Sequence, residues 1–166
     1  MKPLSTISLS VVVLSAALGI GGTSAPASAS AASSEAASYP DTANASADIA
    51  TAIQRAAKLD RRVLVDFGAN WCGDCKVLDA NFHRPDNLAL LREHYVVVHV
   101  NVGEKGIDHN EDLADRYGVP LKKGIPALAV LDKQGHVIYS QKNGEFESMD
   151  RVDPESVHQF LVRWAN

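Results

Sequence analysis

Two cysteines three residues apart are the residues of this sequence best suited to chemistry. Cys72 and Cys75, the only cysteines, stand in the stretch Trp71-Cys72-Gly73-Asp74-Cys75. A short apolar run precedes this stretch and a helical pattern follows it, so we expect Cys72 at the start of a helix. The free N–H groups and partial positive charge there stabilise a thiolate, the reactive form of cysteine. Cys72 is therefore expected to attack disulfides.

The spacing of the cysteines also determines what the second sulfur can do. Residues i and i+3 lie on one face of a helix, so Cys75 is close enough to form a disulfide with Cys72. We expect Cys72 at the exposed tip and Cys75 one turn deeper, as the resolving residue. Three alternatives stay open: a structural disulfide, two inert thiols, or a zinc site completed by His94 and His99. Haem attachment is excluded, because Lys76 and not a histidine follows the second cysteine.

The elements that must hold this motif follow from the pattern of apolar residues. Strands are predicted at 63–67, 95–102, 127–131 and 136–141, and helices at 46–60, 72–82, 87–94, 110–117 and from 154 onwards. The early alternation of helix and strand predicts parallel strands, and the late hairpin adds an antiparallel edge. The sequence thus predicts an α/β fold with a central mixed sheet of about four strands flanked by helices.

The first 45 residues have the pattern of an export signal followed by a tether. Lys2 precedes an apolar stretch at 7–20, and a small-residue site for cleavage near Ala29 follows, with Ala25 as an alternative. An uncleaved anchor is the other interpretation of this segment. We expect a signal peptide at 1–29, an Ala/Ser-rich flexible linker at 30–45 and the folded domain at 46–166. The predicted location is the periplasm, or the exterior if the host has no outer membrane.

The overall composition excludes several other classes of protein. The chain has 166 residues, which suits one domain and a short tail. Its net charge of −4 is the wrong sign for a basic nucleic-acid binder, so we expect no nucleic-acid partner. With two cysteines it is not a multi-disulfide mini-protein. No apolar run reaches the roughly 20 residues of a membrane-spanning helix.

The chain from about residue 50 to 166 resembles the thioredoxin superfamily. The strongest match is the stretch VDFGANWCGDCK at 65–76, and the second is Gly124-Ile125-Pro126 followed by an apolar strand. Both occur in family order with a family-like separation. The nearest subgroup resembles exported thioredoxin-like reductase domains. The resemblance implies a thioredoxin fold.

The resemblance also implies roles for residues around the cysteines. Asp66 matches the buried aspartate beneath the family's active site, a proton acceptor for Cys75; a buried carboxylate is costly unless it is used or paired. Pro126 matches the family's cis-proline, and the backbone of Ile125 before it pairs with an extended substrate. Trp71 resembles the exposed platform beside the sulfurs.

The sequence departs from thioredoxin at three positions near this site. Asp74 stands between the cysteines where thioredoxin has proline, and its charge opposes thiolate formation. Gly68 opens space next to the site. His99 replaces a lysine close to the buried aspartate and could tune Asp66 between pH 5 and 8. A longer segment at 144–152 is expected to be a surface loop or a partner contact.

These features predict an exported thiol–disulfide oxidoreductase that exchanges disulfides with protein thiols through Cys72 and Cys75. No cofactor is expected, because the two sulfurs carry the electrons. Ile125 before the proline resembles reductases more than the periplasmic disulfide oxidant, and this resemblance implies a reductase. Reduction outside the cytoplasm requires a donor, which we expect to be embedded in the membrane. We expect a monomer. The alternative is a non-catalytic binding or assembly module that uses the groove beside Pro126.

Overall fold

The computed structural model describes residues 38–41 and 44–165. The predicted signal peptide and most of the predicted linker lie outside these residues. No helix in the described part is both long and apolar enough to cross a membrane. The elements are α1 (Ala45–Leu59), β1 (Arg62–Gly68), α2 (Gly73–Phe82), α3 (Pro85–His94), β2 (Tyr95–Asn101), α4 (Glu111–Arg116), η1 (Leu121–Lys123), β3 (Ala127–Leu131), β4 (Val137–Ser140), η2 (Met149–Arg151) and α5 (Pro154–Arg163).

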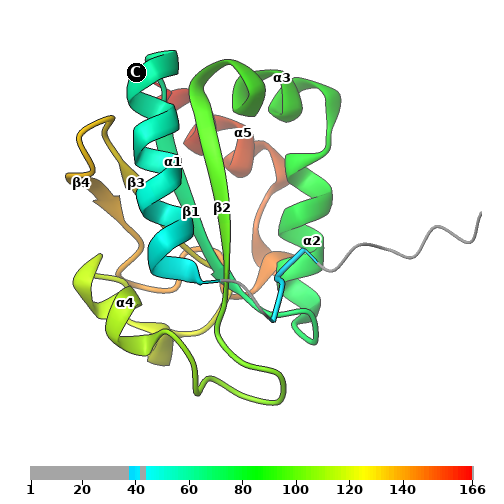
Figure 1. The fold of residues 1–166 in the computed structure, drawn as a ribbon. Coiled ribbons are helices and arrows are strands. Elements are labelled where there is room, and N and C mark those ends of the chain that lie inside the picture. Colours follow the sequence, from blue (N-terminus) through cyan, green and yellow to red (C-terminus); the bar gives the residue numbers. More distant parts are fainter. Residues whose placement is uncertain (1–37, 42–43, 166) are drawn as a thin grey trace, which may run out of the picture. The chain divides into compact units, whose positions relative to one another are not determined.

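The four strands form one mixed sheet in the order β2-β1-β3-β4 (Figure 1). Strands β1 and β2 are parallel, whereas β3 runs antiparallel to both β1 and β4. This arrangement confirms the predicted mixed sheet with an antiparallel edge. It also places β1 in the interior, so the loop after β1 opens at the middle of the sheet.

Strand β1 is buried on both faces, which explains its continuous apolar run. Val63, Val65 and Phe67 contribute to a core that includes Ile49 of α1 and side chains of α4. Leu64 points to the other face, into a core built with side chains of α2, α3 and α5. Because side chains alternate along a strand, Asp66 lies on the same face as Leu64.

Local signals set the starts of the helices on either side of the sheet. The side chain of Asn44 accepts a hydrogen bond from the Ala47 N–H and caps α1. Asp153 caps α5, with Pro154 in the first turn, as the sequence predicted. The helix predicted to start at Cys72 begins at Gly73, with Cys72 as its N-cap.

Two segments are more deeply buried than the sequence suggested. We expected residues up to about 45 to lie outside the fold, but Tyr39 is buried, with only 1% of its surface exposed. The segment at 144–152, expected to be a surface loop or a partner contact, buries Phe146 and Met149 in the core on the α5 side of the sheet. Both differences arise from contacts between residues far apart in the chain.

Candidate active site

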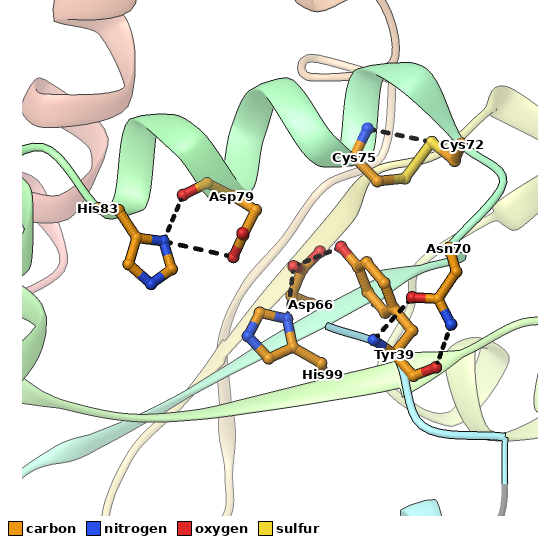
Figure 2. Close-up of polar contacts among 8 residues, drawn as sticks. All are labelled: Tyr39, Asp66, Asn70, Cys72, Cys75, Asp79, His83 and His99. Carbon is orange, nitrogen blue, oxygen red and sulfur yellow. Dashed lines mark hydrogen bonds and ion pairs between the residues drawn. A yellow bond between two sulfur atoms is a disulfide. The ribbon is translucent and has the colours of Figure 1, made fainter. Parts of the chain in front are cut away.

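Cys72 and Cys75 are joined by a disulfide at the start of α2, at the carboxyl end of β1. Their Cα atoms are 5.3 Å apart, a normal distance for a disulfide. The backbone N–H of Cys75 donates a 3.1 Å hydrogen bond to the sulfur of Cys72 (Figure 2). Cys72 is less exposed than expected, at 5%, but Cys75 is fully buried at 0%. Both cysteines are thus buried in the oxidised protein, and the roles of Cys72 as the attacking residue and Cys75 as the resolving one stay predictions.

The Ile125–Pro126 peptide bond is cis, as the resemblance implied. The loop before β3 brings this peptide to the disulfide, and the carbonyl oxygen of Ile125 lies 3.7 Å from the sulfur of Cys72. The backbone that is expected to bind substrate therefore lies directly beside the reactive sulfur.

Trp71 lies immediately before the attacking cysteine and is 47% exposed. Its indole N–H donates a 2.8 Å hydrogen bond to the carbonyl oxygen of Gly103, in the loop after β2. The hydrogen bond fixes the ring while its face stays accessible. This placement is compatible with the substrate platform that the resemblance implied.

Asp66 is fully buried in β1, beneath α2 (Figure 2). The parallel register of β1 and β2 places His99 directly opposite it, and Nδ1 of His99 lies 3.0 Å from Oδ2 of Asp66. The other carboxylate oxygen, Oδ1, has no hydrogen-bond partner among the described residues. A buried oxygen without a partner is costly, so Oδ1 is available to accept a proton.

The environment of His99 has opposing effects on its charge. Burial lowers the pKa of His99, but the hydrogen bond and negative charge of Asp66, together with the charge of Asp79, raise it above the ordinary value. The imidazolium is thus stabilised next to the buried carboxylate. His99 occupies the place where the family has a lysine, and it can supply a positive charge there.

Tyr39 is the residue of this site that the sequence did not identify. Its hydroxyl donates a 2.7 Å hydrogen bond to Oδ2 of Asp66, and its ring meets that of His99 edge-on. Two features of the sequence pointed to this contact: Tyr39 is a single aromatic residue within an Ala/Ser-rich stretch, and Gly68 has no side chain to occupy the space beside the site. Neither signal by itself predicts a contact across 27 residues.

A zinc site formed by the cysteines with His94 and His99 finds no support in the geometry. No group of three or more His, Cys, Asp and Glu residues in the described ranges is arranged to hold a metal ion. The ring of His99 is instead bonded to Asp66. The arrangement is that of two sulfurs that can open and close a disulfide above a buried acid.

Comparisons with known proteins agree with this geometry. A family model described as thioredoxin-like matches residues 44–133. The thioredoxin of Pongo abelii is 32% identical over 114 residues, which cover 68% of this chain and 92% of that protein. The thioredoxin of Pseudomonas aeruginosa is 38% identical over 80 residues, covering 48% of this chain and 64% of that protein.

Among solved structures, a disulphide isomerase from Xylella fastidiosa Temecula1 superposes with a TM-score of 0.70 at 33% identity. The match covers 75% of this chain and 94% of the isomerase. Similarity in sequence, in fold and in the cysteine pair therefore leads to one conclusion. The chain belongs to the thioredoxin-like family and is a thiol–disulfide oxidoreductase whose electrons are carried by Cys72 and Cys75.

Proposed function

We propose that this oxidoreductase is exported and works as a reductase of protein disulfides. The observation that carries the direction is the environment of the Cys72 sulfur. Its polar contacts within the described residues are the N–H of Cys75 and the carbonyl of Ile125. Among the described residues no side chain donates a hydrogen bond to it, and the side chain of Ile125 is apolar. Beyond the helix N-terminus, the Cys72 thiolate therefore gains no stabilisation from side chains of the described residues, and a less stabilised thiolate favours the disulfide, which is the property of a reductant.

The reaction proceeds by two exchanges of sulfur. The Cys72 thiolate attacks a substrate disulfide, forms a mixed disulfide and expels one substrate thiolate. The Cys75 thiol then loses its proton, for which Asp66 is the acceptor in this proposal, and the Cys75 thiolate attacks the sulfur of Cys72. The mixed disulfide breaks, the second substrate thiolate leaves and takes up a proton, and the Cys72–Cys75 disulfide remains. Two electrons have passed from the protein to the substrate.

The substrate in this proposal is an extended protein segment carrying a disulfide. The Ile125 backbone lies beside the sulfur of Cys72. Trp71, the residue before Cys72, exposes part of its ring on the surface. An extended chain can pair with backbone groups without a demand for particular side chains. The protein acts as a monomer, since one chain supplies both sulfurs and the peptide beside them.

The reduction potential of the Cys72–Cys75 pair tests the direction. The mature protein is equilibrated in dithiothreitol or glutathione redox buffers, and the fraction reduced is measured by thiol trapping and Trp71 fluorescence. A reductase requires a value close to that of thioredoxin, about −270 mV. A value near about −120 mV, typical of a strong periplasmic oxidant, would reverse the proposed direction.

Export and the electron donor require a separate experiment. The pattern at 1–29 supports export, and an oxidising compartment supports a membrane-embedded donor of electrons. The full chain is expressed in its host, and the protein from each fraction is analysed by N-terminal sequencing. A chain that begins near Ser30 in the periplasm is expected, whereas a full-length chain in the cytoplasm would contradict export. In a Cys75→Ser variant, the Cys72 thiolate should attack the disulfide of the oxidised donor, the reverse of the physiological step; one donor sulfur leaves as a thiolate and the other stays bound to Cys72, which traps the donor covalently.

A further inference from the structure

Tyr39 precedes the first helix, and its side chain ends at the buried carboxylate of the active site. The side chain is 1% exposed, and its hydroxyl lies 2.7 Å from Oδ2 of Asp66 (Figure 2). A buried hydroxyl that donates to a carboxylate forms a charge-assisted hydrogen bond, which is stronger than one between neutral groups. The hydroxyl of Tyr39 therefore contacts the carboxylate directly, in addition to the packing of its ring.

The backbone of Tyr39 is held at the carboxyl ends of β1 and β2. Its N–H donates to Oδ1 of Asn70 at 3.1 Å, and Nδ2 of Asn70 donates back to its carbonyl at 2.7 Å. The side chain of Asn101 donates to the same carbonyl at 3.3 Å. Asn70 is two residues before the attacking Cys72, so the segment is fixed to the turn that carries the reactive sulfur.

The domain has a space shaped for this ring. A Cβ atom placed on Gly68 would come within 2.6 Å of Cε1 of Tyr39, closer than real Cβ contacts. Glycine at position 68 therefore makes room for the tyrosine. The space that Gly68 leaves next to the active site is filled by Tyr39, which stands 29 positions earlier in the chain.

The polar and sulfur-bearing side chains around Asp66 come from three elements. Tyr39 approaches from the segment before α1, His99 from β2, and α2 carries Cys75 and Asp79, whose charge acts on both Tyr39 and His99. From β3, the opposite residue is the apolar Leu128. Burial, followed by the charge and hydrogen bond of Asp66, raises the pKa of Tyr39 far above its ordinary value. Tyr39 consequently stays a proton donor in its hydrogen bond throughout the working range of pH.

We propose that Tyr39 is a positioning residue for disulfide exchange: its hydroxyl holds the Asp66 carboxylate ionised and oriented, ready to accept the proton of Cys75. This inference rests on Asp66 as the proton acceptor in the proposed function. His99 shares the same oxygen, so the carboxylate is held from two sides, and Oδ1 has no partner in the described part of the chain. The segment before the first helix is thus part of the active site.

The test is the Tyr39→Phe variant, which keeps the ring over Gly68 and removes only the hydroxyl. The matched control is Tyr95→Phe, because Tyr95 is also buried and donates one 2.7 Å hydrogen bond, to the Leu161 carbonyl on another part of the domain. Each reduced protein is mixed with a disulfide-linked peptide from pH 5 to 9, and its oxidation is followed by Trp71 fluorescence. Loss of a hydrogen bond to a charged group should move the acid limb of the rate profile upward by about one pH unit. The Tyr95→Phe profile should coincide with that of the wild type.

The Asp66→Asn variant distinguishes the role of Asp66 as proton acceptor from the role of Tyr39 as positioning residue. If Asp66→Asn removes the acid limb and Tyr39→Phe leaves it in place, Asp66 keeps its role and the proposal for Tyr39 is wrong. If Asp66→Asn leaves the profile unchanged, the role of Asp66 fails and that of Tyr39 with it. In the double variant, Tyr39→Phe should have no further effect on the pH profile.

A measurement on the wild-type protein gives an independent test. With ¹³C labels in aspartate and tyrosine, the Cζ of Tyr39 should shift with pH at the same midpoint as the Asp66 carboxyl carbon. Tyr95 should show no such shift. If the Tyr39 signal does not change at the pH where the Asp66 carboxyl carbon shifts, the coupling between the two residues is overturned, whatever the stability of the variants.

Discussion

The carboxylate of Asp74 accepts a 2.7 Å hydrogen bond from the backbone N–H of Met149, 75 residues further along the chain. Asp74 lies between the two cysteines in the first turn of α2, and Met149 begins the short helix η2. The residue that replaces the proline of thioredoxin therefore connects the longer segment at 144–152 to the active-site helix. The same segment brings Glu147 next to Gly124, close to the cis-proline.

Two substitutions of Asp74 distinguish the effect of its charge from the effect of its hydrogen bond to Met149. Asp74→Asn removes the charge but keeps an oxygen acceptor, so the thiolate of Cys72 should form at a pH lower by about half a unit. The rate of iodoacetamide alkylation against pH measures this change. Asp74→Ala loses the charge and the acceptor, and it should also increase hydrogen exchange at 146–152. Equal exchange in both variants would show that the hydrogen bond does not hold the segment.

Replacing each cysteine in turn separates attack from resolution. Cys72→Ser should reduce disulfide turnover to the uncatalysed rate, because no thiolate remains at the helix start. Cys75→Ser should still attack and then accumulate a mixed disulfide, which mass spectrometry detects as one covalently bound substrate. If Cys75→Ser were inactive while Cys72→Ser trapped substrate, the two roles would be exchanged.

Adding a side chain at Gly68 tests the space that holds Tyr39. Gly68→Ala should destabilise the oxidised protein by roughly 1–3 kcal/mol in urea unfolding, because the new Cβ overlaps the ring. Gly106→Ala is the control, since a Cβ there meets no atom of the described residues within 4 Å. In a Tyr39→Ala background the cost of Gly68→Ala should largely disappear. An unchanged cost in that background would mean that the overlap with Tyr39 is not the cause.

His99 should make the stability of the protein depend on pH. Its folded pKa is raised above 6.5, so its contribution to stability is fully present below that value and is lost as pH rises through the folded pKa. The free energy of unfolding of the wild type should exceed that of His99→Gln by more at pH 5.5 than at pH 8.5. Denaturant unfolding at the two pH values measures this difference. In an Asp66→Asn background, which removes the partner of His99, this pH dependence should vanish. If the difference in unfolding free energy between the wild type and His99→Gln is the same at both pH values, the pairing is contradicted.

The chemistry of the site could be predicted from the sequence because it depends on neighbours in the chain. An apolar strand, a turn and a helix place Cys72 at a helix N-terminus, and a spacing of three brings Cys75 to its side. The resemblance added Asp66 and the cis peptide before Pro126. Of these expectations, the fold, the disulfide and the cis bond are confirmed, and the proton transfer stays a prediction.

Only the tertiary structure determined what surrounds the buried acid and the helix start. The pairing of His99 with Asp66 depends on the register of two strands 33 residues apart. The contacts of Tyr39 and Asp74 join segments 27 and 75 residues away. Local propensity cannot encode such contacts, because each depends on how the whole sheet and its helices pack. The sequence by itself determined which atoms react, whereas the packing of distant segments determined which groups control their protons.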